Sequence, residues 1–187
     1  MEIFDEIKKH PQRETIKVCK SGKWGIIDKY QNCIIPCTYD DISFGSDDGQ
    51  YFEVYNNNLC GIIDRENKFI IPCLYDFVDY PKNSYFAALK KNKFGLIDKN
   101  CNVIIPFEYD NMSNCLPDAI AVEKNSKWGF IDINNNKLSE FIYDELFCCN
   151  CKYYANISSK WGIIDKYGNI IVPFIYTAPV ELDNENN

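Results

Sequence analysis

The chain has 187 residues, a formal net charge of −7 and a sequence pI near 4.8. Apolar residues make up 46% and aromatic residues 15% of it, which excludes an intrinsically disordered chain. The acidic balance argues against nucleic acid as a partner, because such partners require a basic surface, and a single His removes most His-based catalysis and zinc chemistry.

The first ten residues contain no basic region followed by an apolar run, so no secretory signal is visible. No stretch approaches the roughly 18 apolar residues of a membrane span. We therefore expect a cytoplasmic protein without a membrane partner. In that reducing compartment the ten Cys are expected to be mostly free thiols.

An internal repeat organises the chain from Trp24 onward. One pentapeptide pattern, an apolar residue followed by Gly, two apolar residues and Asp, occurs five times at spacings of 33 to 36 residues. The five copies are Trp24-Gly25-Ile26-Ile27-Asp28, Cys60-Gly61-Ile62-Ile63-Asp64, Phe94-Gly95-Leu96-Ile97-Asp98, Trp128-Gly129-Phe130-Ile131-Asp132 and Trp161-Gly162-Ile163-Ile164-Asp165.

A second element follows each pentapeptide at a fixed distance. It is an Ile-Pro type run, which the fourth unit replaces by Leu138-Ser139-Glu140. A Tyr comes 15 residues after each Trp position, and Asp follows that Tyr in the first four units, whereas Thr177 follows it in the fifth. Phe4-Asp5-Glu6-Ile7 is similar to this Tyr-Asp element and lies ahead of the first unit.

The stretch 160–176 resembles the bacterial WG repeat, also called the KWG repeat, and the resemblance covers about residues 4–177. The family is a tandem β repeat without a common enzymatic activity, so the resemblance implies fold more than function. One domain is expected over 1–180, followed by an acidic disordered tail at 181–187. Its units cover about 4–39, 40–75, 76–109, 110–143 and 144–177.

β-branched and aromatic residues dominate the apolar runs, and helical spacing is absent. The sequence therefore predicts an all-β fold, a tandem array of five three-stranded antiparallel meander units that share one core. The Tyr-Asp segment is a candidate for a fourth short strand. A closed five-bladed small propeller is the alternative, since units of this length must stack to bury enough apolar area.

The recurring residues are interpreted as structural. Apolar replacements at the Trp position favour a core role for the three Trp side chains, and a Gly inside a strand indicates close backbone approach. Each Asp begins a hairpin turn, where its carboxylate can accept backbone amides, and this favours turn capping over a metal site. These residues are Trp24, Gly25, Asp28, Gly61, Asp64, Gly95, Asp98, Trp128, Gly129, Asp132, Trp161, Gly162 and Asp165.

The cysteines mostly occupy positions where other units carry apolar residues, so they are interpreted as small hydrophobes. The one cluster is Cys148, Cys149 and Cys151. It is a remote candidate for metal binding, redox chemistry or Cys-dependent catalysis, but a complete four-ligand zinc set is not visible. No cofactor and no catalytic residue is predicted.

Function is expected in the variable segments that follow each Tyr-Asp, because they leave equivalent points of the units. A partner-binding edge is predicted at Asp47, Asp48, Asp79, Tyr80 and Phe147. We therefore expect a non-catalytic module for protein–protein interaction or scaffolding. A small-ligand binder in a stress or phage-conflict system is the alternative, and a Cys-dependent enzyme is a remote one.

Overall fold

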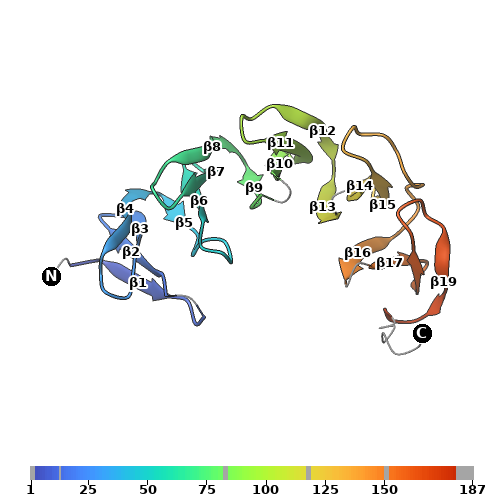
Figure 1. Ribbon diagram of the computed structural model, residues 1–187, viewed down its shortest axis with the longest axis horizontal. Helices are drawn as coiled ribbons and strands as arrows, with labels where there is room; N and C mark the ends of the chain where they lie inside the picture. The colour runs from blue at the N-terminus through green and yellow to red at the C-terminus, as the bar shows by residue number, and fades with distance from the viewer. Residues whose placement is uncertain (1–2, 13, 82–83, 117–118, 150–151, 180–187) are drawn as a thin grey trace. The chain divides into compact units, whose positions relative to one another are not determined.

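The computed structural model describes residues 3–12, 14–81, 84–116, 119–149 and 152–179 (Figure 1). Within these ranges, nineteen strands form five antiparallel sheets, and no residue is helical. Among these residues there is thus no helix with the length and hydropathy needed to cross a membrane. The predicted acidic tail lies outside the described residues.

Each sheet follows the chain as a meander, as Figure 1 shows. The first sheet contains β1 (Glu6–Lys9), β2 (Ile16–Lys20), β3 (Lys23–Ile27) and β4 (Cys33–Tyr39). The second contains β5 (Asp41–Ile42), β6 (Tyr51–Asn56), β7 (Leu59–Asp64) and β8 (Phe69–Tyr75). The third contains β9 (Phe77–Val78), β10 (Tyr85–Lys90), β11 (Lys93–Asp98) and β12 (Val103–Tyr109).

The fourth sheet contains only β13 (Asn111–Leu116), β14 (Ala119–Lys124) and β15 (Lys127–Ile131). The fifth contains β16 (Glu145–Cys149), β17 (Lys152–Ile157), β18 (Lys160–Ile164) and β19 (Ile170–Tyr176). The all-β array of antiparallel meanders is therefore confirmed, with a fourth strand in four of the five sheets. The closed five-bladed ring stays an alternative prediction.

The missing strand of the fourth sheet has a local cause. Where other units have Ile-Pro, this unit has Ser139, and the Ser139 hydroxyl oxygen accepts the Phe130 amide at 2.9 Å. This side-chain contact replaces a ladder hydrogen bond, and only isolated bridges remain at Trp128–Tyr143 and Ile131–Lys137. The departure from the repeat pattern thus coincides with the loss of regular pairing.

The contacts divide the chain into two compact units, 1–92 with 96–103, and 93–95 with 104–187. In the first unit, Ile26, Ile35 and Tyr39 of the first sheet pack against Ile42 and Phe52 of the second. In the second unit, the fourth and fifth sheets enclose an equivalent cluster around Phe130, Tyr143, Leu146, Tyr153 and Ala155. The core therefore lies between successive sheets, where each buries the face that it could not cover alone.

Candidate functional site

The loop between β5 and β6 and the segment after β9 line an open acidic hollow of about 410 Å³ on the surface. Both segments belong to the first unit. The hollow is lined by Ser46, Asp47, Asp48, Tyr51, Asp79, Tyr80 and Pro81. Of the described residues that line it, three are Asp and none is Lys or Arg.

Hydrogen bonds fix the first side of the hollow. The buried Ser46 hydroxyl donates to Asp48 Oδ1 at 2.6 Å and accepts the Tyr51 amide at 3.0 Å. Asp48 Oδ1 also accepts the Gln50 amide at 2.9 Å. These bonds to Ser46 and Gln50 lower the pKa of Asp48, so its carboxylate is charged at neutral pH.

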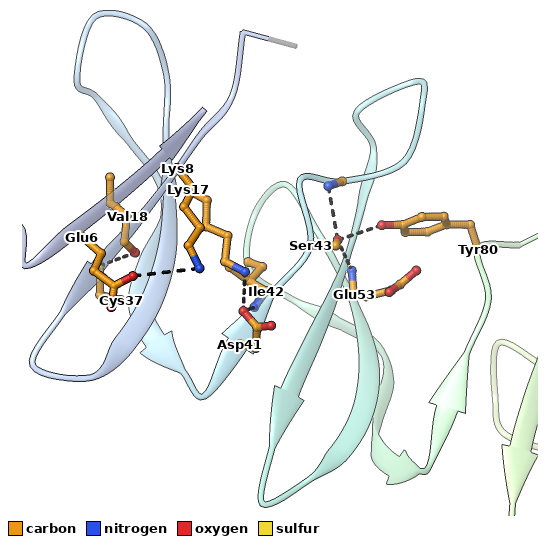
Figure 2. A network of polar contacts seen from close by, with 11 residues as sticks. Glu6, Lys8, Lys17, Val18, Cys37, Asp41, Ile42, Ser43, Glu53 and Tyr80 are labelled. Carbon is orange, nitrogen blue, oxygen red and sulfur yellow. Dashed lines mark hydrogen bonds and ion pairs between the residues drawn. The ribbon is translucent and has the colours of Figure 1, made fainter. Parts of the chain in front are cut away.

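The second side is held through Ser43 (Figure 2). The Ser43 oxygen accepts the amides of Gly45 at 3.2 Å and Glu53 at 2.9 Å, and it lies 2.7 Å from the Tyr80 phenol oxygen. Asp79 Oδ1 accepts the Tyr80 amide at 2.8 Å. Ser43 thus ties the second sheet to the segment after β9, and both sides of the hollow have a defined geometry.

The electrostatics of the hollow favour a cation. Burial raises the pKa of the Glu53 carboxyl, and the negative charge of Asp79 raises it further. The smaller of these two effects places the negative charge of Asp79 close to the Glu53 carboxyl. A Lys or Arg side chain in the hollow would relieve the repulsion between these acids.

A second hollow of about 300 Å³ adjoins the first and shares Ser46, Asp47 and Asp48 with it. Glu14 and Asp28 contribute two more carboxylates to its lining, and Arg65 contributes one guanidinium. The two hollows together form an acidic surface on the first unit, on either side of the loop between β5 and β6.

The structure brings together four of the five residues predicted for the partner-binding edge. The fifth, Phe147, lies on β16 in the second unit, where its ring stacks on Tyr154 with centroids 5.2 Å apart and meets the edge of Trp161 at 5.5 Å. Sequence reasoning missed Ser43 and Glu53. The position of Glu53 carries Lys17 in β2, Ala in β10 and β14 and Tyr154 in β17, so variation between the units did not single out Glu53.

The five recurring aspartates lie at the turns after their WG strands. Asp28 Oδ1 accepts the amides of Tyr30 and Asn32, both at 2.8 Å, and its Oδ2 accepts the Asn32 side chain. The Asn32 bond is the main reason why the pKa of Asp28 is lowered. The same pair of backbone bonds recurs at Asp64, Asp98, Asp132 and Asp165.

The Gly of each WG pair lies where two strands approach closely. A Cβ on Gly25 would lie 2.5 Å from the Ile35 oxygen, and one on Gly61 would lie 2.7 Å from the Ile71 oxygen. The nearest backbone oxygen of the neighbouring segment lies at 2.7 Å for Gly95, 3.0 Å for Gly129 and 2.6 Å for Gly162. No side chain larger than hydrogen fits the four closest approaches without a backbone shift.

The Trp side chains are half-buried against neighbouring groups. Trp24 carries Lys8 and Lys17 over its ring at 4.5 and 4.6 Å, Trp128 packs against the cluster of the second unit, and Trp161 contacts Phe147. None of the three lines the acidic hollow.

The cysteine cluster is only partly described. Cys148 and Cys149 are successive residues of β16, and Cys151 lies outside the described residues. Successive strand residues point to opposite faces, which separates the two thiols. Within the described ranges, no group of three or more His, Cys, Asp or Glu side chains is arranged to hold a metal ion.

Successive antiparallel sheets of three or four strands, which bury apolar faces against one another within each unit, define a tandem β-repeat protein. A family model described as "WG containing repeat" matches residues 24–60, 61–94, 94–128, 128–155 and 161–181. The chain therefore belongs to the WG-repeat family. A search of curated proteins finds no match.

Two solved structures share this fold at low identity. The chain is similar to "Crystal structure of the eukaryotic initiation factor", with a TM-score of 0.58 and 14% identity over 97% of this chain and 55% of that one. It is also similar to "KlHsv2 with loop 6CD replaced by a Gly-Ser linker", with a TM-score of 0.53 and 7% identity over 89% and 63%. A WD40 domain of SCAP from fission yeast matches with a TM-score of 0.46 and 12% identity over 94% and 56%. The chain thus spans between about half and two thirds of these structures.

Proposed function

We propose that this chain is a non-catalytic protein-binding module that binds a basic segment of a partner protein at the acidic hollow. The observation that carries the proposal is the convergence of Asp47, Asp48 and Asp79 with Tyr51 and Tyr80 around one hollow of about 410 Å³. Tyr side chains are enriched at protein interfaces, and the carboxylates complement Lys or Arg. The non-catalytic reading rests on the sequence, in which no catalytic set is recognisable.

The test measures binding of a fluorescent hexa-arginine peptide and a hexa-glutamate peptide to the 187-residue chain by fluorescence anisotropy. We expect the basic peptide to bind, the acidic peptide not to bind, and the affinity to fall with added salt because exposed charges are screened. Asp47→Asn and Asp79→Asn should each weaken binding by up to about fivefold, the range of exposed ion pairs. Asn keeps the oxygen that accepts the Tyr80 amide, so the hollow should retain its shape.

Glu66→Gln is the matched control. Glu66 is exposed in the turn between β7 and β8 and does not line either hollow. The Glu66→Gln substitution removes the same charge as the two Asp→Asn substitutions. If only long-range electrostatics mattered, all three variants would therefore lose the same amount of peptide affinity. Equal effects of Glu66→Gln and Asp79→Asn, or tight binding of the acidic peptide, would contradict the proposal.

A small cationic ligand is the second candidate, because the hollow has the volume of a small-molecule site. Spermidine is the probe in isothermal titration calorimetry. Saturable spermidine binding that Asp79→Asn weakens, together with failure of the peptide to bind, would favour this candidate over a protein partner.

A further inference from the structure

Successive sheets meet through faces that recur along the chain. We call the side that meets the following sheet the back face, represented by Ile26, Ile35 and Tyr39 in the first sheet. The side that meets the preceding sheet is the front face, represented by Ile42 and Phe52 in the second. The Tyr39 hydroxyl lies 2.7 Å from the side-chain oxygen of Asn67, a left-handed residue in a turn of the second sheet.

The back face of the fifth sheet is uncovered by the described residues. Tyr176 is 39% exposed, whereas its four counterparts Tyr39, Tyr75, Tyr109 and Tyr143 are at most 5% exposed. Ile171 is 62% exposed, although Ile34 and Leu138 at its position pack against the joint that follows their sheets. Two positions that are covered elsewhere are therefore open here.

The front face of the first sheet is also uncovered by the described residues. Ile7 is 58% exposed, whereas its counterparts Ile42, Val78, Met112 and Leu146 are at most 8% exposed. Cys33 and Cys37 line a groove of about 250 Å³ beside Phe4, the half-buried sequence counterpart of Tyr39.

This groove corresponds to a site that a Tyr fills in the second sheet. There, Phe69 and Cys73 take the places of Cys33 and Cys37, and the Tyr39 ring meets the edge of Phe69 with centroids 6.3 Å apart. Gln31 is the left-handed residue that corresponds to Asn67. The groove of the first sheet thus has the features that receive a Tyr from a back face.

The two uncovered faces also carry complementary charges. Lys23 pairs with Asp40 at 2.5 Å and Lys127 with Asp144 at 2.5 Å, next to the joints that follow their sheets. Lys160 holds the same position in the fifth unit, where Thr177 replaces the Asp. Beside the front face of the first sheet, Asp5 accepts the Ser21 amide at 2.6 Å, as Asp40 accepts that of Asn57 at 2.7 Å. Neither Lys160 nor Asp5 forms an ion pair with the described residues.

We propose that the chain self-associates head to tail, the back face of the fifth sheet docking on the front face of the first sheet of a second copy. Tyr176 enters the groove at Cys33 and Cys37, Ile171 and Ile7 are buried in the joint, and Lys160 faces Asp5. A second copy is the occupant because the required partner of each face is present in the same sequence. Such an interface is heterologous, so association continues beyond a dimer unless it closes into a ring of copies.

The experiment is sedimentation velocity on the 187-residue chain over a concentration series. We expect the mass to rise with concentration for the wild type. Ile171→Asp should abolish association through the back face and Ile7→Asp through the front face. Each variant alone should be monomeric, whereas a 1:1 mixture should form a dimer from the one intact face of each copy.

Ile170→Asp is the matched control for Ile171→Asp, since Ile170 is 63% exposed on the same strand. The fourth unit carries Lys137 at this position, so the position accepts charge. The control should associate like the wild type. Monomeric wild type at every concentration, association of either Asp variant alone at the wild-type level, absence of a dimer in the mixture, or an equal loss with Ile170→Asp would each overturn the proposal.

Discussion

Gly25→Ala should destabilise the first sheet far more than its change of one methyl group suggests. The new Cβ would lie 2.5 Å from the Ile35 oxygen, 2.7 Å from the Pro36 carbonyl carbon and 2.8 Å from the Cys37 nitrogen. All three are backbone atoms of the neighbouring strand, so relief requires a shift of β4 rather than of a side chain. Overpacking of this kind costs about 3 kcal/mol at the upper end of its range.

Gly22→Ala is the internal control in the same sheet. Gly22 has φ of +75° and nothing within 4 Å of its Cβ position, so only the left-handed backbone is penalised, at about 1 kcal/mol. For a chain of this size, about 1 kcal/mol corresponds to a change of 2–4 °C in Tm. Calorimetry should therefore show a fall of about 6–12 °C for Gly25→Ala and about 2–4 °C for Gly22→Ala. A Gly25→Ala variant as stable as Gly22→Ala would refute the close-approach argument.

Three further results are expected. Tyr109→Phe removes the bond of 2.7 Å to Asn135 and should cost about 1 kcal/mol in urea unfolding, whereas Tyr167→Phe at an exposed ring should change the stability little. The turn residues Asp28, Asp98 and Asp132 have lowered pKa values in the folded chain, so the stability that they contribute is present above their unfolded pKa and should decline as the pH falls below about 3.8; urea titrations between pH 7 and pH 2.5 check the sign. Burial raises the pKa of the Cys60 thiol to about 11, so iodoacetamide at pH 8 should alkylate the exposed Cys33 first and Cys60 only on unfolding, as mass spectrometry of the labelled peptides would show.

The repeat spacing was sufficient to predict the meanders because it reflects a cross-strand pair. Trp24 lies opposite Tyr39, and Trp161 lies opposite Tyr176. The register shifts between these pairs and the Ile-Pro run, at the point where Gly25 approaches β4. A constant distance of 15 residues is what a hairpin with two irregularities at fixed places requires. The spacing of the repeat was therefore sufficient to predict that each unit forms a meander.

The acidic hollow was only partly predictable. Its carboxylates lie in segments that vary between the repeats. Because such loops were expected to share an edge, Asp47 and Asp79 were both predicted for the partner-binding edge. Phe147 was predicted for the same edge because it follows Tyr-Asp in its unit, but its ring packs on Tyr154. Position in the repeat specifies where a loop leaves its sheet, whereas the contacts of the side chain depend on neighbours that differ between units.

The joints between sheets were the feature that the sequence predicted least well, because each joint is formed by residues from two repeats. The left-handed turn residue of the following sheet is Asn67 for Tyr39 and Asn135 for Tyr109, and both tyrosine hydroxyls lie 2.7 Å from its side-chain oxygen. The turn residue varies between units, so aligning the repeats with one another does not reveal the pairing. Because a hydroxyl removed from water must be hydrogen-bonded, each of these tyrosines makes the stability of one sheet depend on the turn of the next. This coupling adds to the burial of apolar faces through which each unit of about 34 residues depends on its neighbours.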